Sequence, residues 1–186
     1  MTATREPTAL PEVVALIPQR FEDDRGWFQP LVTPEDGEAL AGWTPFVQVN
    51  QSRSHRGVLR GLHLQTRRPQ GKLVQVTRGA IFDVAVDLRP GSPAFGQWAG
   101  RVLSAANRAA LWIPPGFAHG FYALEDSDLL YLVTAPWDPD HELTLLWDDP
   151  EVGVDWPLDG PPQVSERDAA GVAFAEARRI LTGAPS

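Results

Sequence analysis

Apolar and polar side chains alternate along much of the chain between residues 46 and 147. The alternation is clearest at 46–50, 72–77 and 82–88, where β-branched residues take turns with polar or small ones. A period of two is typical of strands that bury one face. Gly- and Pro-rich turn sequences separate such segments, at 67–71, 89–93 and 114–116. The pattern predicts an all-β fold, an antiparallel sandwich or barrel.

Only the C-terminal segment has a convincingly helical composition. Ser165 to Asp168 forms a candidate N-terminal cap for it. The helix-favouring residues that follow are Ala169, Val172, Phe174, Ala175, Ala177, Ile180 and Leu181. We expect one domain, residues 1–186, with a core at about 15–160 and a short helical segment at about 165–181.

Composition narrows the classes of function. The formal net charge of −8 and the pI near 4.9 disfavour nucleic-acid binding, which needs clustered basic residues to neutralise phosphates. The chain has no cysteine, which removes disulfides and thiolate chemistry and fits a reducing compartment. It has no signal-peptide pattern and no apolar run of about 18 residues. We therefore expect a cytoplasmic protein with no membrane or nucleic-acid partner.

Two residues suggest proton-transfer chemistry. His63 lies in a predicted β segment, and Lys72, the one lysine in the chain, begins the next. An ammonium is a compact point charge that a guanidinium does not replace. The alternative is that Lys72 is a surface lysine retained by chance. Together with Arg25 and Arg60 it could also line a local basic pocket for an anionic ligand inside an acidic exterior.

Strand periodicity leaves the direction of several side chains open. Gln48 and Asn50 share one face of their strand, and in a barrel they would line the interior. In the alternative they face solvent, and Val47 and Val49 form the core. Arg60 and His63 have opposite parity, so both can face a pocket only if the strand is irregular. Gly61 is the natural place for a bulge.

The segment from Pro114 to Gly120 contains the Pro-x-Gly-x-x-His half of the pattern found in cupins, which are jelly-roll barrels that often bind a metal. The metal-binding half is missing, because position 65 is Gln and no Glu follows at the expected spacing. Two imidazoles supply too few ligands for a firm divalent site. We predict that His119 is not a metal ligand and that no metal is bound. A hydrogen-bonded core histidine is its alternative role.

The chain resembles the dTDP-4-dehydrorhamnose 3,5-epimerase family, a branch of the cupins that works without metal. The resemblance extends over roughly residues 15 to 170. The segments that carry it are 21–28, 48–52, 57–63, 70–74, 82–88, 111–121, 147–150 and 165–168.

The resemblance implies a homodimeric cupin-type jelly roll, without a cofactor, that acts on a thymidine-diphosphate 4-keto-6-deoxyhexose. It implies that His63 is the base, that Asp168 orients and tunes His63, and that Lys72 faces the enolate oxygen. The substrate contacts that we expect from it are Arg25, Phe28, Gln48, Asn50, Arg60, His119 and Trp137, with Arg25 reaching into the partner subunit's pocket. Without the family resemblance, the sequence predicts only that Asp168 stabilises the first turn of a helix.

These implied roles agree with the chemistry of such a sugar. Carbons 3 and 5 both flank the 4-keto group, so the loss of either proton gives an enolate, and return of a proton to the other face inverts the centre. Imidazole titrates near neutrality, as a base for this step should. An ammonium placed beside the developing oxyanion would stabilise it.

Trp137 departs from the family pattern, because it occupies the position at which we expect the family's proton-donating tyrosine. An indole N–H donates hydrogen bonds but is not a usable acid. Water, His119 or Tyr131 could donate instead, the enzyme could invert one centre only, or the pocket could serve another reaction or binding alone. Tyr131 would be about 20 Å from Trp137 along an extended strand, which argues against a simple exchange of acids. Trp137 could also be a stacking platform or core filler.

Overall fold

Two antiparallel sheets form the body of the molecule in the computed structural model, which describes residues 3–40 and 42–183. The six-stranded sheet has the order β1 (Thr4–Pro7), β2 (Val14–Ile17), β10 (Ala110–Ile113), β7 (Lys72–Arg78), β12 (Ser127–Val133) and β5 (Gln48–Ser54). The five-stranded sheet has the order β13 (Glu142–Thr144), β6 (Leu59–Gln65), β11 (Phe117–Ala123), β8 (Ala80–Asp87) and β9 (Trp98–Ser104). The all-β jelly-roll prediction is confirmed.

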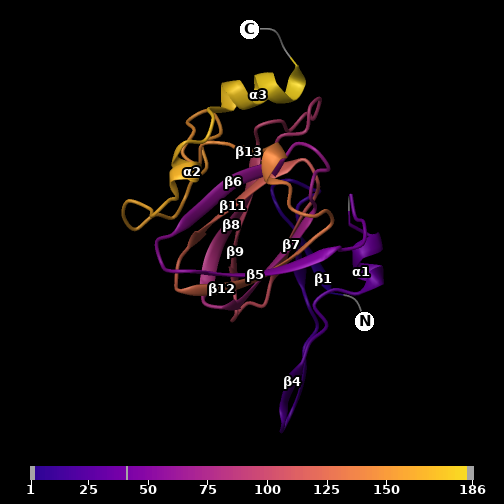
Figure 1. Cartoon of the computed structure of the whole chain (residues 1–186). Helices are drawn as coiled ribbons and strands as arrows, with labels where there is room; N and C mark the ends of the chain where they lie inside the picture. The colour runs from indigo at the N-terminus through magenta and orange to yellow at the C-terminus, as the bar shows by residue number, and fades with distance from the viewer. Residues whose placement is uncertain (1–2, 41, 184–186) are drawn as a thin grey trace.

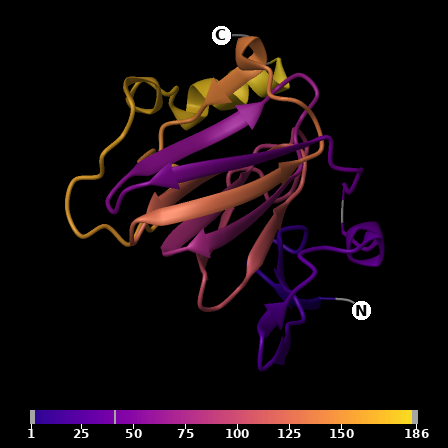
Figure 2. The same ribbon diagram turned by 60° about the horizontal axis from the view of Figure 1, so that its bottom comes forward.

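The core lies between the two sheets, which wrap around a common interior (Figures 1 and 2). Val74 and Leu111 from the six-stranded sheet pack in one cluster with three residues from the five-stranded sheet, and all five are buried. The three are Ile81, Leu103 and Phe117. Each comes from a strand in which alternate side chains point inward. The alternation in the sequence therefore corresponds to one shared apolar interior.

The N-terminal region contributes more structure than we expected. Strand β1 begins at Thr4, before the predicted start of the core near residue 15, and pairs with β2. A short helix, α1 (Pro34–Glu38), begins after Thr33, whose side chain accepts a hydrogen bond from the Asp36 backbone. A separate hairpin of β3 (Phe21–Asp23) and β4 (Gly26–Phe28) projects away from the barrel (Figure 1).

The C-terminal segment is not one helix, as its composition predicted, but two. Helix α2 (Glu166–Ala169) ends before α3 (Phe174–Thr182) begins. Between them Val172 forms a bridge with Leu145, and a Cβ on Gly171 would lie 2.9 Å from the Leu146 backbone nitrogen. This close approach to the sheet interrupts the helix, because the backbone there bonds to the neighbouring strand. None of the described helices is long and apolar enough to cross a membrane.

Candidate active site

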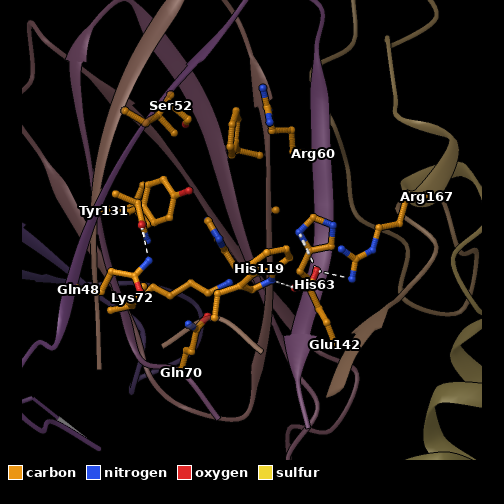
Figure 3. A pocket seen from close by; sticks show the side chains of 17 residues that line it. Gln48, Ser52, Arg60, His63, Gln70, Lys72, His119, Tyr131, Glu142 and Arg167 are labelled. Atoms are coloured by element: carbon orange, nitrogen blue, oxygen red, sulfur yellow. Dashed lines mark hydrogen bonds and ion pairs between the residues drawn. The ribbon is translucent and has the colours of Figure 1, made fainter. Parts of the chain in front are cut away.

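A cavity of about 380 Å³ lies between the two sheets and is lined mainly by polar side chains (Figure 3). This volume falls in the range of small-molecule sites. The polar residues that line it are Gln48, Asn50, Ser52, Arg60, His63, Gln70, Lys72, His119, Tyr131, Trp137, Glu142 and Arg167. Among the apolar ones are Val74, Phe121, Leu129 and Val133.

Strand β5 presents its polar face to this cavity. Gln48 Nε2 donates a hydrogen bond to Asn50 Oδ1 over 2.6 Å, and Ser52 continues the same face. Val47 and Val49 point outward and are 59% and 58% exposed. The alternative in which the valines form the core is therefore wrong, and the same parity argument could have added Ser52 to the predicted site.

An irregularity in β6 brings both Arg60 and His63 into the cavity. The pairing of β6 with β11 shifts register between His119 and Phe121, which lie opposite His63 and Arg60 respectively. Gly61 lies inside this shift with a φ of +114°, and a Cβ there would be 2.5 Å from the Gly120 Cα atom. Only glycine fits such a conformation and approach. The irregularity expected at Gly61 is confirmed.

His63 forms a hydrogen-bonded pair with Asp168. The distance from His63 Nε2 to Asp168 Oδ1 is 2.6 Å, and the carboxylate is buried. Burial on its own raises the pKa of Asp168, but hydrogen bonds with His63, Ser165 and the Gly61 backbone outweigh it and lower the pKa below its usual value. An ionised carboxylate can only accept. His63 therefore carries its proton on Nε2, and its Nδ1 is free to act as a base.

Asp168 occupies a helix terminus as well. The Ser165 side chain accepts a hydrogen bond from the Asp168 backbone nitrogen over 3.1 Å, so Ser165 is the N-cap of α2. The Asp168 carboxylate, however, points to His63. The short helix thus serves to present a carboxylate to a strand more than a hundred residues earlier in the chain.

Lys72 and His119 lie together in the cavity. Burial lowers the pKa of the Lys72 ammonium, and the carboxylates of Glu142 and Asp83 oppose this only in part. Within residues 3–40 and 42–183 the ammonium has no hydrogen-bond or ion-pair partner, so it is available to a ligand. His119 Nε2 lies 2.7 Å from Asp83 Oδ1. Burial lowers the pKa of His119 against the opposing effect of Asp83, so this ring is neutral near pH 7.

Tyr131 and Trp137 line the same cavity, because the chain does not stay extended between them. Strand β12 ends at Val133 and the chain then bends. The argument against Tyr131 from its separation along an extended strand is therefore wrong. Tyr131 lies across the cavity from His63 (Figure 3). Burial raises the pKa of its phenol, which Arg60 opposes in part, so the hydroxyl keeps its proton at neutral pH.

Besides Asp168, which contacts the lining residue His63, two predicted site residues do not line the cavity of this chain: Arg25 and Phe28. They belong to the projecting β3–β4 hairpin, where Arg25 pairs with Asp23 over 2.6 Å and Phe28 is 66% exposed. The nearby Trp27 is 61% exposed. Neither Arg25 nor Phe28 is among the residues that line the cavity of its own chain.

Glu142 and Arg167 are site residues that the sequence analysis missed. Arg167 donates to Glu142 Oε1 over 3.0 Å, and Trp137 Nε1 donates to Glu142 Oε2 over 2.5 Å. Glu142 could have been noticed, because it is an acidic residue only five positions after Trp137. Nothing in the sequence marks Arg167, except that it precedes Asp168. Among the described residues no group of three or more His, Asp or Glu is arranged to hold a metal ion.

Comparison with known proteins agrees with this geometry. The family model for dTDP-4-dehydrorhamnose 3,5-epimerase matches residues 7–176. The dTDP-4-dehydrorhamnose 3,5-epimerase of Pseudomonas aeruginosa is 52% identical over 179 residues, covering 95% of this chain and 98% of that protein. The enzyme of the same name from Salmonella typhimurium is 46% identical, covering 91% and 94%.

Solved structures extend the likeness to three dimensions. A dTDP-6-deoxy-D-glucose-3,5-epimerase from Legionella pneumophila, solved with dTDP-4-keto-L-rhamnose, superposes with a TM-score of 0.88 at 44% identity and covers 94% of this chain and 96% of its own. A 3'-monoepimerase from Streptomyces bikiniensis, solved with dTDP-quinovose, gives a TM-score of 0.86 at 33% identity and covers 95% and 91%. With the family model covering most of the chain, this protein belongs to the dTDP-4-dehydrorhamnose 3,5-epimerase family.

Proposed function

We propose that this protein is an isomerase that epimerises a thymidine-diphosphate 4-keto-6-deoxyhexose in deoxysugar biosynthesis. One observation carries the proposal: a histidine paired with a buried carboxylate shares one cavity with a phenol and with an ammonium that has no partner in the described part of the chain. That set contains a base, a positive charge for an enolate oxygen and an acid on the far side. The relatives are named as epimerases.

The reaction follows from these positions. His63 Nδ1 removes the proton from carbon 3 or carbon 5, and the electron pair moves through carbon 4 to the keto oxygen. Lys72 stabilises the enolate oxygen, in a cavity where a fixed charge acts more strongly than in water. A proton from Tyr131 returns to the opposite face and the enolate re-forms the ketone. Exchange with water then removes the proton from His63 and restores that of Tyr131.

Tyr131, and not Trp137, is our candidate acid. It is the one phenol among the described residues that line the cavity, and it lies opposite the base. The second tyrosine, Tyr122, donates to Asp159 outside the cavity. A variant of the Streptomyces bikiniensis enzyme that replaces one histidine and one tyrosine has been solved with dTDP, which fits a paired role for these residue types. Tyr131 as a candidate acid supports catalysis over a pocket kept for binding alone.

A Tyr131→Phe variant tests the proposed function beside the wild type. Each is incubated with thymidine-diphosphate 4-keto-6-deoxyglucose in deuterium oxide and followed by proton NMR. We expect the wild type to introduce deuterium at carbon 3, carbon 5 or both, with inversion. In the variant, inversion falls about 100-fold or more, while exchange with retention continues, because His63 can return a deuteron to the face that it deprotonates.

The matched control is Tyr122→Phe, which removes the other phenol and leaves inversion unchanged. The absence of exchange in the wild type would overturn the epimerase proposal for this substrate. Inversion at the wild-type rate in Tyr131→Phe would exclude Tyr131 as the acid. The stereochemistry of the wild-type product also decides between one centre and two, since relatives of both kinds exist.

The pH profile should have an alkaline limb that comes from Lys72. Because burial lowers the pKa of this ammonium, it loses its charge at a lower pH than an exposed lysine does. The rate therefore falls as the pH rises through that value, while Tyr131, whose pKa is raised, remains protonated. In Lys72→Arg the guanidinium keeps its charge, so the residual activity should lack this limb. Profiles of kcat against pH for the wild type and Lys72→Arg test whether Lys72 causes the alkaline limb.

We also propose, from the family resemblance, a cytoplasmic homodimer that needs no metal or cofactor. The hairpin supports the dimer, because it projects from the barrel (Figure 1) and its Arg25, Trp27 and Phe28 side chains are exposed. In such a dimer Arg25 and Phe28 would contact the substrate in the partner subunit. Gln48, Asn50, Arg60 and Trp137 would contact it from within the same chain.

A further inference from the structure

Glu142 lies beside His63 at the ring nitrogen that Asp168 does not contact, and both side chains line the cavity. Its Oε1 atom is 3.8 Å from His63 Nδ1, the nitrogen that Asp168 leaves free. The carboxylate is 8% exposed and comes from β13, the strand next to β6 at the edge of the five-stranded sheet. The base therefore has one carboxylate at each nitrogen, and only the one at Nε2 is within hydrogen-bond distance.

Both oxygens of Glu142 are held by other residues. Oε1 accepts from the Arg167 guanidinium over 3.0 Å, and Oε2 accepts from the indole N–H of Trp137 over 2.5 Å. Arg167 comes from α2 and Trp137 from the bend after β12, so two separate elements hold the carboxylate that β13 carries. Figure 3 shows Glu142 between His63 and Arg167 at one edge of the cavity.

We propose that Glu142 is a positioning residue for the base, and that Trp137 acts on the reaction through Glu142. The proposal rests on the proposed role of His63. When His63 takes the substrate proton on Nδ1 its ring becomes a cation, and the negative charge of Glu142 stabilises that cation. The tethers keep the carboxylate at 3.8 Å, so Nδ1 stays open to the substrate.

The tethers matter because a free carboxylate would compete for the base. A carboxylate that rotated onto Nδ1 would favour a proton on that nitrogen and leave no lone pair for the sugar. The indole N–H is a donor that is never ionised in this pH range, so it holds Oε2 without adding charge. This gives Trp137 a function that needs no acidic proton.

A tether and a stacking platform at Trp137 would affect different kinetic constants. A platform contributes to substrate binding, so its loss raises KM or the Kd of dTDP. A tether contributes to proton transfer, so its loss lowers kcat. Trp137→Phe keeps an aromatic ring and removes the N–H donor, whereas Trp137→His keeps an aromatic ring with an N–H donor and does not introduce the tyrosine that the family pattern places here.

The kinetic test compares these two variants with Glu142→Gln, which is isosteric and uncharged. We expect kcat to fall about 10- to 100-fold in Glu142→Gln and about 3- to 10-fold in Trp137→Phe. KM and the Kd of dTDP by calorimetry should change less than about twofold, and Trp137→His, assayed at a pH where the new ring is neutral, should recover most of kcat. Asp138→Asn is the matched control, because it alters the neighbouring carboxylate, which pairs with His141, and leaves kcat unchanged.

A second readout does not depend on turnover. The chain has four histidines, so ¹⁵N-histidine NMR can assign each ring, and the nitrogen shifts report which ring atom carries the proton. We expect the His63 signals to change in Glu142→Gln and Trp137→Phe, with those of His55 unchanged. If the wild type lacks exchange yet the His63 signals respond, the proposed function fails and the placement of the base by Glu142 stands.

Two results overturn the proposal on Glu142. One is that the wild type exchanges the substrate protons while kcat and the His63 signals are unchanged in both Glu142→Gln and Trp137→Phe. The other is an equal rise of KM in Trp137→Phe and Trp137→His at unchanged kcat, which makes Trp137 a binding platform only.

Discussion

Replacing His63 with asparagine should lower the rate of proton exchange at carbons 3 and 5 of the 4-ketosugar by about 10²- to 10⁴-fold, the usual contribution of a positioned base. Asparagine is the informative substitution, because its amide can still donate to Asp168. Alanine would leave that buried carboxylate without its histidine partner, at a cost to stability. The measurement is deuterium incorporation by NMR, with the Kd of dTDP as a check that the cavity is intact.

His55→Asn is the matched control for this variant. Its side chain is 77% exposed and pairs with Asp126 away from the cavity, so exchange should continue at the wild-type rate. If His63→Asn keeps wild-type exchange while binding dTDP normally, the base is another group. His119 would then be the first candidate, because it lies opposite His63 in the β11–β6 pairing.

Replacing Lys72 with methionine should change activity and stability in opposite directions. The rate should fall about 10²- to 10³-fold, because the enolate oxygen loses the fixed charge that faces it. The free energy of unfolding should rise, by about 1 kcal/mol, because a partly buried ammonium with no direct partner among the described residues is replaced by an apolar side chain of similar length. Single-turnover exchange and thermal unfolding measure the two effects.

The stability result distinguishes two roles for this lysine. A lower melting temperature in Lys72→Met would show that the ammonium mainly neutralises the nearby carboxylates of Glu142 and Asp83. Gln70→Met is a suitable control, because it places the same side chain at the neighbouring lining position without removing a charge. Opposite signs for rate and stability are expected where a site holds a charge for chemistry at the expense of the fold.

Strand β5 shows which part of the site could be predicted from the sequence and which part could not. Alternation placed Gln48 and Asn50 on one face, but a period of two assigns faces only relative to each other. Which face was inside depended on pairing with β12, where Asn50 lies opposite Tyr131. The local pattern also could not predict that Tyr131 and Trp137 line the same cavity. The bend after Val133 that allows this depends on tertiary contacts.

The C-terminal segment shows a different limit. Helix-favouring composition predicted one helix, and the contact of Gly171 with the Leu146 backbone divides it into two. The same segment carries Asp168 to His63 and Arg167 to Glu142. Composition describes what a segment prefers in isolation, whereas these contacts come from where the sheet holds it.

By itself the sequence determined the all-β fold, the irregularity at Gly61 and the family resemblance, because alternation, a glycine within a strand and contiguous motifs are all local features. Only the tertiary structure decided that Tyr131 faces the base, that Glu142 lies at its free nitrogen and that Arg25 and Phe28 lie outside the cavity. Those relations join residues far apart in the chain. They depend on strand register and on the positions of bends, which the packing of the two sheets sets.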